Sequence, residues 1–220
     1  MLSFSGIDIP RTLDEAVCLD RTALLVYDMQ VGILSQMDGA GHIVERVGAA
    51  LDAAREVGLR TYFVRHTSLP KNLMGRFQVR QALAWQRTED PGDIAPWFLR
   101  GAASTEITPE LAPRETEAVF DKLSMSAFEG TPLDFALRDC DIRTLLVVGV
   151  ATEIGIEPTV RHAADLGYVP IIVADACGAS HAEAGERALA SLRFMGDTLF
   201  TTVEDIAALL REKASSRRAA

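Results

Sequence analysis

Six short apolar runs are spaced along the chain, separated by longer segments in which apolar positions recur with helical spacing. The runs cover residues 22–27, 60–64, 117–121, 144–148, 170–174 and 198–201. The run over 144–148 shows no polar alternation, which is typical of a strand buried on both faces. Helices are expected over 42–57, 131–138, 157–167 and 203–211, and after the capping-box pattern at 180–183. This alternation predicts a mainly parallel six-stranded sheet with right-handed crossovers.

Residues 66–105 interrupt the regular alternation. They are rich in proline and glycine and contain both tryptophans, Trp85 and Trp97. A connection this long in a compact domain is typical of a functional lid or an interface. The alternative is an ordinary excursion with a short helix over 79–85. Within a single domain over 1–220, residues 1–20 are expected to form an N-terminal arm and the Ser- and Arg-rich residues 212–220 a disordered tail.

Three predicted strands are each followed by groups that could take part in catalysis or ligand binding. The run over 144–148 leads into a turn at 149–156 and then a helix, which brings backbone N–H groups and a helix dipole to one place. Two other runs stop at Asp28 and Lys122. The carboxyl ends of parallel strands share one edge, so these features are expected to meet in one pocket. Taken singly, Asp28 could instead cap a turn and Lys122 could be a solvated partner of Asp121.

The stretches LLVYDMQ at 24–30, DKLSMSAFEGTPLD at 121–134, GVATEIGIEPTVRHAADLGY at 149–168 and VADA at 173–176 occur in this order. In these stretches the chain resembles the isochorismatase-like hydrolase superfamily, also called the cysteine hydrolases, from about Thr22 to Leu210. The resemblance implies a three-layer α/β/α sandwich. It implies that Asp28 is the catalytic acid/base and that Lys122 supports it. It also implies a cis peptide bond between Val150 and Ala151.

The resemblance places the nucleophilic cysteine of the amidase members at Gly155, which offers no nucleophile. Gly155 could mark lost activity. However, true isochorismatases also carry glycine at this position and hydrolyse a vinyl ether by protonation, without a covalent intermediate. They have an aromatic residue and a histidine where this chain has Ala151 and Glu153, and the GVAT start and TVRHAADLGY finish of this stretch look more like the amidase branch. The N–H groups near Gly155 are expected to serve as anion donors, and the turn is expected to bind substrate through Ala151, Thr152, Ile154 and Ile156.

Four further residues are candidates with two readings each. His66 follows the second strand and could donate to a substrate carbonyl or cap that strand. Arg76 and Arg87 lie in the long connection and could clamp a carboxylate or be solvated. Cys177 could replace the missing thiol, but a core cysteine is the favoured interpretation. His66 and Arg76 are predicted to bind substrate.

Composition limits the kinds of molecule with which this chain is expected to interact. A net charge of −9 over 220 residues argues against nucleic acid and against an anionic membrane surface. No signal peptide is expected, and no apolar run approaches the ~18 residues of a membrane span. Three widely spaced cysteines favour a reducing cytoplasm over a disulfide framework or a zinc site. Nicotinamidase relatives hold a metal with an Asp-x-His pair after the first strand, which residues 29–70 lack, so no metal or other cofactor is expected.

These observations favour a cofactor-free hydrolase of a small organic molecule, with Asp28 as general acid or base, Lys122 in support and water as the nucleophile. The first alternative is an amidase or C–N hydrolase with a substituted nucleophile. The second is a non-catalytic binding protein that keeps the pocket. Superfamily members are commonly dimers or tetramers, so a homo-oligomer is expected, with residues 66–105 helping to close a neighbour's pocket.

Overall fold

The core is a six-stranded, fully parallel sheet. The computed structural model describes residues 1–219. The strand order is β5-β4-β3-β6-β7-β8, with β3 and β6 at the centre. The strands are β3 (Thr22–Tyr27), β4 (Arg60–His66), β5 (Ala118–Lys122), β6 (Thr144–Val150), β7 (Val169–Gly178) and β8 (Leu199–Thr201). The predicted sheet is confirmed, and the shared strand direction brings all six carboxyl ends to one edge.

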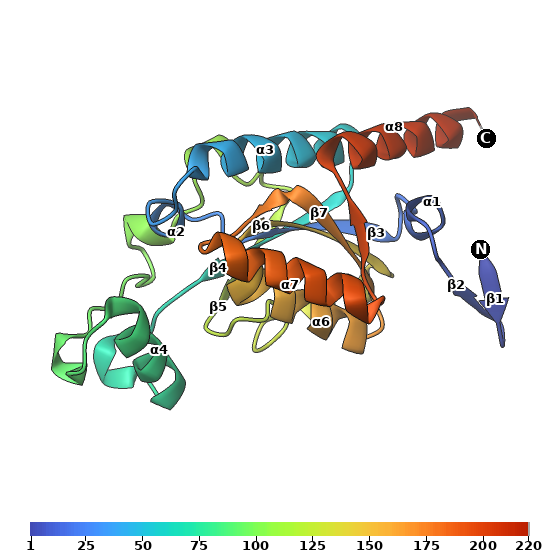
Figure 1. Cartoon of the computed structure of the whole chain (residues 1–220). Helices are drawn as coiled ribbons and strands as arrows, with labels where there is room; N and C mark the ends of the chain where they lie inside the picture. Colours follow the sequence, from blue (N-terminus) through green and yellow to red (C-terminus); the bar gives the residue numbers. More distant parts are fainter. Residues whose placement is uncertain (220) are drawn as a thin grey trace.

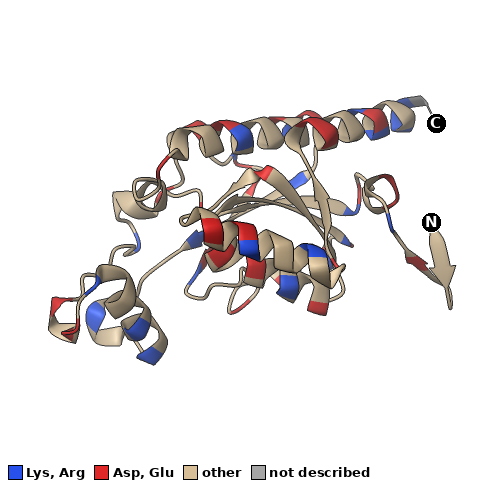
Figure 2. Ribbon diagram, in the orientation of Figure 1, with Lys and Arg blue, Asp and Glu red and all other residues tan. Residues whose placement is uncertain are grey.

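Helices cover both faces of this sheet, as Figure 1 shows. One face carries α3 (Ala40–Glu56) and α8 (Val203–Ala219); the other carries α5 (Leu133–Asp139), α6 (Glu157–Asp165) and α7 (Ala182–Met195). Alternation along β3 explains the two cores, because Leu24 and Val26 pack on the α3 side while Leu25 and Tyr27 pack on the α6 side. Charged residues lie mainly on the outer helices and loops in Figure 2. The structure is therefore the predicted three-layer α/β/α sandwich.

The predicted irregular region contains one real helix. Residues between β4 and β5 form α4 (Arg76–Gln86) and the 3₁₀ turns η1 (Lys71–Leu73), η2 (Pro91–Asp93), η3 (Ala103–Thr105) and η4 (Pro109–Leu111). We call residues 67–105 the excursion. In Figure 1 its α4 part projects away from the sheet. The short helix α2 (Val31–Leu34) follows β3 on the same side of the molecule.

The N-terminal arm begins as a small antiparallel hairpin of β1 (Leu2–Phe4) and β2 (Ile7–Ile9), followed by α1 (Leu13–Ala16). The hairpin stands apart from the sheet in Figure 1. Leu2 pairs with Ile9 and Phe4 with Ile7, and all four side chains are exposed.

The C-terminal end differs from the expected disordered tail. Helix α8 continues to Ala219, and Ala220 lies outside the described residues. Two ion pairs tie its last turns to the N-terminal arm: Lys213 to Asp14 at 2.7 Å and Arg217 to Asp20 at 2.9 Å. Composition alone does not reveal these partners because they lie at the other end of the chain.

Candidate active site

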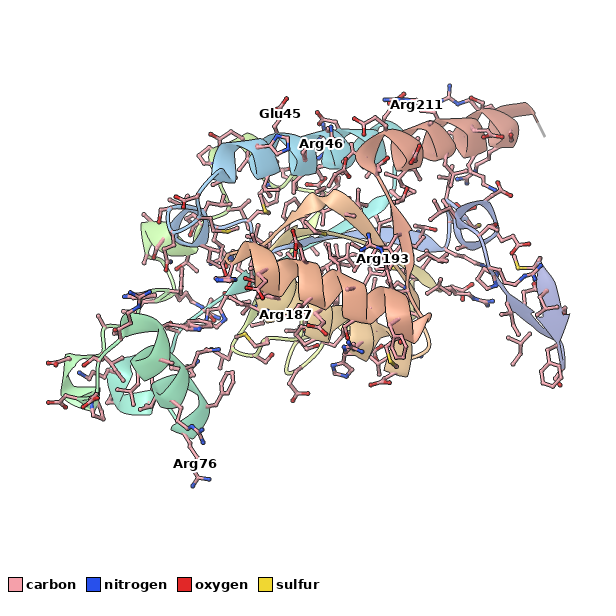
Figure 3. The ribbon with its side chains drawn as sticks, viewed as in Figure 1. Glu45, Arg46, Arg76, Arg187, Arg193 and Arg211 are labelled. Carbon is pink, nitrogen blue, oxygen red and sulfur yellow. The ribbon has the colours of Figure 1, made fainter. Side chains whose placement is uncertain are left out.

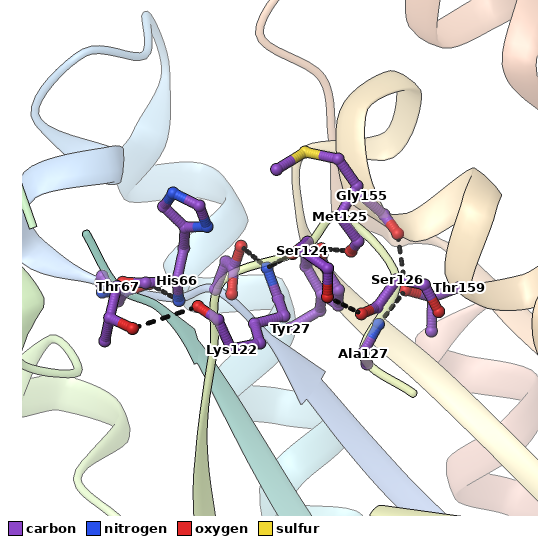
Figure 4. A network of polar contacts seen from close by, with 12 residues as sticks. Tyr27, His66, Thr67, Lys122, Ser124, Met125, Ser126, Ala127, Gly155 and Thr159 are labelled. Carbon is purple, nitrogen blue, oxygen red and sulfur yellow. Dashed lines mark hydrogen bonds and ion pairs between the residues drawn. The ribbon is translucent and has the colours of Figure 1, made fainter. Parts of the chain in front are cut away.

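A buried ion pair lies at the carboxyl edge of the sheet. Asp28 follows β3 and Lys122 ends β5, and the Lys122 Nζ donates to the Asp28 Oδ2 at 2.8 Å. Asp28 is 6% exposed and Lys122 is 2% exposed. The Lys122 ammonium also donates to the carbonyl of Ser124 at 3.3 Å, as Figure 4 shows. The second carboxylate oxygen of Asp28, Oδ1, is buried and has no hydrogen-bond partner among the described residues. This oxygen is therefore available to a substrate or a water molecule.

Burial changes the protonation of both partners. It raises the pKa of Asp28 to about 6, although the neighbouring Lys122 ammonium opposes the shift. It lowers the pKa of Lys122, against the attraction of the Asp28 carboxylate. The carboxyl can therefore take up and release a proton close to neutral pH, which general acid–base catalysis requires.

The backbone of Asp28 is unusual. Its φ is +49°, in the left-handed region that residues other than glycine seldom adopt. The Asp28 N–H donates to the carbonyl of Val64 on β4 at 3.1 Å, which holds the turn in place. Strained backbone of this kind concentrates at functional sites, where the surrounding structure enforces it. Here it turns the carboxylate away from the continuing strand direction and towards Lys122.

His66 ends β4 and lies beside the pair without carrying charge. Burial, with a smaller contribution from the Lys122 ammonium, lowers the pKa of His66 to about 3. Its ring packs edge-on against Phe98 at 5.6 Å and Trp85 at 6.4 Å between ring centroids. Its Nδ1 is buried and has no partner among the described residues. A neutral imidazole with an unpartnered nitrogen can hydrogen-bond a polar group of a ligand.

A buried glutamine that no sequence pattern singles out, Gln30, holds His66 in place. Gln30 is fully buried, and its amide Nε2 donates to the carbonyls of His66 at 2.9 Å and Thr105 at 3.1 Å. Its Oε1 accepts the N–H of His66 at 2.7 Å. This amide therefore joins the end of β4 to the end of the excursion.

The turn after β6 is a π-helical turn, η5 (Thr152–Ile156), and the Val150–Ala151 peptide bond before it is cis, as the resemblance implies. The N–H groups of Ile154, Gly155 and Ile156 all point to the carbonyl of Ala151, at 3.2, 3.0 and 3.2 Å. The expectation that these groups are free anion donors is therefore not met in this structure. The wider π-helical turn brings three donors onto a single acceptor.

Glu153 ties this turn to the next helix. Its Oε1 accepts the N–H groups of Ser180 and His181, each at 2.9 Å, and the Ser180 hydroxyl. Ser180 is therefore not the N-cap of α7 that the capping-box pattern predicts. His181 takes that place, and its Nδ1 accepts the N–H of Ala184 at 3.4 Å.

Tyr27 fills the space beside Gly155. A Cβ added at Gly155 would overlap the Tyr27 ring and hydroxyl. The ring is 1% exposed, and its hydroxyl donates to the carbonyl of Met125. The Lys122 Nζ lies 4.4 Å from the ring centroid. Burial raises the pKa of Tyr27 well above its usual value, so the phenol stays neutral. In this structure a side chain at position 155 and the ring at position 27 exclude each other.

These residues border a cavity of about 360 Å³ between the sheet edge and the excursion. Asp28, His66, Tyr27 and Gly155 line its inner side. Most other lining side chains are apolar or aromatic, namely Ile33, Met37, Trp85, Trp97, Phe98, Met125 and Ile154. A cavity of this size and character is typical of a small-molecule site.

The structure brings most of the predicted site residues together. Asp28, His66, Ala151, Ile154 and Gly155 line the cavity, and Lys122 lies directly behind Asp28.

Three other predicted residues do not line this cavity. Arg76 begins α4 and points away from the body of the protein in Figure 3. Thr152 is buried and donates to the carbonyl of Gly178 at 3.0 Å, and Ile156 is buried in the core on the α6 side. Which side of α4 and of the π-helical turn faces the cavity decides which of their side chains line it. The sequence alone does not show how either element is rotated about its axis.

Cys177 is not placed to act as a substitute nucleophile. Burial raises the pKa of its thiol, and its Sγ lies 3.5 Å from the carbonyl of Val147 within the sheet. The thiol is therefore protonated and unreactive, as expected for a core cysteine. Residues 1–219 contain no group of three or more His, Cys, Asp or Glu arranged to hold a metal ion. No helix in the same range combines the length and apolar character needed to cross a bilayer.

Comparison with known proteins supplies the family. The Isochorismatase domain family matches residues 22–206. The chain is 30% identical over 175 residues to the uncharacterized isochorismatase family protein YwoC of Bacillus subtilis, covering 80% of this chain and 85% of that protein. It is 30% identical over 207 residues to the ureidoacrylate amidohydrolase RutB of Methylorubrum extorquens, covering 86% and 81%. The chain therefore belongs to the isochorismatase family of hydrolases.

Solved structures agree on the fold. A cysteine hydrolase from Pseudomonas syringae superposes with a TM-score of 0.78 at 24% identity, covering 90% of this chain and 96% of the other. An isochorismatase family protein from Burkholderia thailandensis gives a TM-score of 0.71 at 28% identity, covering 87% and 96%. The three-layer architecture is thus shared over nearly the whole chain.

Proposed function

We propose that this hydrolase cleaves a small organic substrate by direct attack of water, with Asp28 as the proton carrier and no covalent enzyme intermediate. The observation that carries the proposal is the buried Asp28–Lys122 pair, whose Oδ1 has no partner and which borders a small-molecule cavity. With a pKa of about 6, Asp28 is mostly ionised at neutral pH and can act as a general base.

The chemistry follows from this arrangement. Water bound at the Asp28 Oδ1 attacks the electrophilic carbon of the substrate while its proton passes to the carboxylate. The same proton then moves from Asp28 to the leaving group as the bond to that group breaks. Lys122 keeps the carboxylate in position and favours its ionised form between turnovers. Protons and charge balance, and the enzyme returns to its starting state.

Two features support water over a covalent route. The resemblance puts the amidase cysteine at position 155, where this chain has glycine and the Tyr27 ring fills the adjacent space. The Cys177 thiol, which is partly buried and whose pKa is raised by burial, is not a replacement. A purely binding role is disfavoured because a buried charge pair is costly and packing alone does not require it.

A C–N bond is the second candidate for the bond that breaks. The specific observation in its favour is the similarity to proteins named ureidoacrylate amidohydrolase. In that case the carbonyl carbon of an amide or ureido group takes the water, and Asp28 delivers the proton to the departing nitrogen. The other candidate is an enol ether, to which the base mechanism above does not apply: Asp28 would first protonate the substrate in its acid form, and water would then add to the resulting cation. The pH dependence separates the two because they require opposite protonation states of one carboxyl.

The test is a substrate screen with a matched pair of variants. Purified protein is incubated with a panel of amides, ureido compounds and enol ethers, and Asp28→Asn is compared with Asp38→Asn, whose carboxylate is exposed. We expect Asp28→Asn to abolish turnover and Asp38→Asn to leave it unchanged. Intact-protein mass spectrometry during turnover should show no adduct. A trapped acyl or alkyl adduct, or full activity in Asp28→Asn, would refute the proposal.

We also propose that the chain assembles as a homo-oligomer. Its support is the exposed apolar surface of the hairpin, where Phe4 is 71% and Ile7 66% exposed, since an isolated two-stranded hairpin is marginal in water. In the excursion, Phe77 and Trp85 are also exposed. Light scattering after size exclusion should give a multiple of the 23.9 kDa chain mass. A monomer at micromolar concentration would contradict the proposal.

A further inference from the structure

The charge balance of the cavity points to the kind of molecule it holds. Among its lining residues only Asp28 and Arg87 carry full charges. The charge of Asp28 is balanced by Lys122, and His66 is neutral. Arg87 forms no ion pair with any other residue in 1–219. The cavity therefore presents one uncompensated positive charge, in a protein whose net charge is −9.

The apolar side chains that line the cavity also indicate which kind of ligand it binds. Trp85 is 41% and Trp97 36% exposed, although both line the cavity. Phe98 and Met125 continue the same apolar wall. Large aromatic side chains left partly open to solvent at a cavity gain free energy when a flat apolar group covers them.

We propose that the site takes a monocarboxylate with a flat, apolar body, the carboxylate held by Arg87 and the body lying against Trp85 and Trp97. This inference rests on the proposed function for its location and adds the substrate class. A guanidinium matches a carboxylate bidentately and keeps its charge under all relevant conditions.

The two ends of such a ligand are distinguished by charge. Arg87 caps the C-terminus of α4 in the excursion, whereas Asp28 lies at the sheet edge. A carboxylate next to the ionised Asp28 would be repelled, so it lies on the Arg87 side. The neutral, reacting group then faces Asp28 and the unpartnered Nδ1 of His66. The cavity volume of about 360 Å³ limits the ligand to a small molecule.

Arg76 provides a matched control. It lies on the same helix, bears the same charge and does not line the cavity. Figure 2 shows that several basic residues surround α4, so a general electrostatic effect of this region would appear in both variants. The comparison of Arg87→Gln with Arg76→Gln separates a specific contact from that general effect.

The experiment measures binding without turnover. The protein keeps Asp28, because removing its charge would leave Lys122 unbalanced beside the cavity. Phenylacetate and acetate have no bond to hydrolyse, and phenylacetamide is measured immediately after mixing. Intrinsic tryptophan fluorescence is the signal, since the chain's two tryptophans both line the cavity. The probes are phenylacetate, its neutral analogue phenylacetamide, and acetate, which lacks the apolar body. We expect saturable quenching by phenylacetate at millimolar concentration, about tenfold weaker binding of phenylacetamide, and no saturation by acetate.

Arg87→Gln should weaken phenylacetate binding about tenfold, equivalent to about 1.4 kcal/mol, and leave phenylacetamide unchanged. Arg76→Gln should change neither. Equal binding of phenylacetate and phenylacetamide, no saturable quenching by phenylacetate, or equal effects of the two arginine variants would overturn the inference. A carboxylate preference in a protein that hydrolyses nothing would refute only the proposed function. Asp28-dependent hydrolysis without that preference would refute only the substrate class.

Discussion

Introducing a cysteine at position 155 is the most informative single change, because the structure predicts that it destabilises the fold for a steric reason. The new Cβ would overlap the ring and hydroxyl of Tyr27. Tyr27 is buried at the end of β3 and its hydroxyl is bonded to the Met125 carbonyl, so making room for the new side chain would displace the ring towards the cavity and break that bond. Gly155→Cys should therefore destabilise the fold before it tests any chemistry.

The magnitude follows from two effects. Overpacking a well-filled core costs about 1–3 kcal/mol, and this site lies at the upper end because two more heavy atoms enter filled space. Losing the Tyr27–Met125 hydrogen bond adds about 1 kcal/mol. A total of about 4 kcal/mol corresponds to a fall in Tm of about 8–16 °C for a chain of this size.

Tyr27→Val is the compensating change. Alone it leaves a cavity and should cost about 3 kcal/mol. In the double variant the cysteine occupies part of that cavity, so the combined loss should fall short of the sum by about 2–3 kcal/mol. Urea unfolding of the wild type, both single variants and the double variant gives this coupling energy directly.

Thiol labelling gives an independent measurement. The wild-type chain has three cysteines, so a fourth thiol is counted against that background. In the double variant it should react quickly, because the Lys122 ammonium and the start of α6 favour a thiolate nearby. In Gly155→Cys alone it should react slowly. Wild-type stability of Gly155→Cys, or a coupling energy near zero, would show that Tyr27 does not occupy this space.

The remaining predictions concern the proton chemistry and the neighbouring groups. With Asp28 as general base, kcat/KM should rise with pH through about 6 and then level, whereas a fall above that pH would mean that Asp28 works protonated. Lys122→Ala should lose about as much activity as Asp28→Asn, and the double variant little more; additive losses would show that the two do not act together. For His66, the imidazole binds a proton below about pH 6.5 in the unfolded chain but only below about pH 3 in the folded chain. The free energy of unfolding therefore falls as the pH falls from neutral towards 5. Wild type should therefore lose about 2 kcal/mol from this group between neutral pH and pH 5, a loss that His66→Gln removes in urea titrations. Alkylating the native cysteines should leave turnover intact, and inactivation that tracks modification of Cys177 would contradict a water nucleophile.

The sequence predicts the sheet well because burial on both faces leaves an unambiguous apolar run. β3 is found over the predicted residues, and β6 extends the predicted run by two residues, to Val150. The meeting of Asp28 with Lys122 was predictable for the same reason, since parallel strands end at one edge and the resemblance picked out which residues to follow.

The rest of the site depends on contacts that no local pattern encodes. The mutual exclusion of Tyr27 and Gly155 joins the end of one strand to a turn far along the chain. Arg87 lines the cavity and Arg76 does not, although both are arginines at the ends of one helix, because docking of α4 decides which end faces inward. In the sequence Glu153 stands out only as a departure from the isochorismatase pattern, whereas in the structure its carboxylate holds the start of α7.

Gln30 has a consequence for how this enzyme can diversify. Its single amide donates to the carbonyl groups of His66, just before the excursion, and Thr105, at its end. The two ends of the excursion are thus held together by one buried amide, so the segment between them can be exchanged while Gln30 still fixes the backbone at the end of β4. We expect exchange of residues 68–104 between family members to transfer substrate preference while the proton chemistry stays with the recipient. Recognition and reaction can then evolve, or be engineered, on separate parts of the chain.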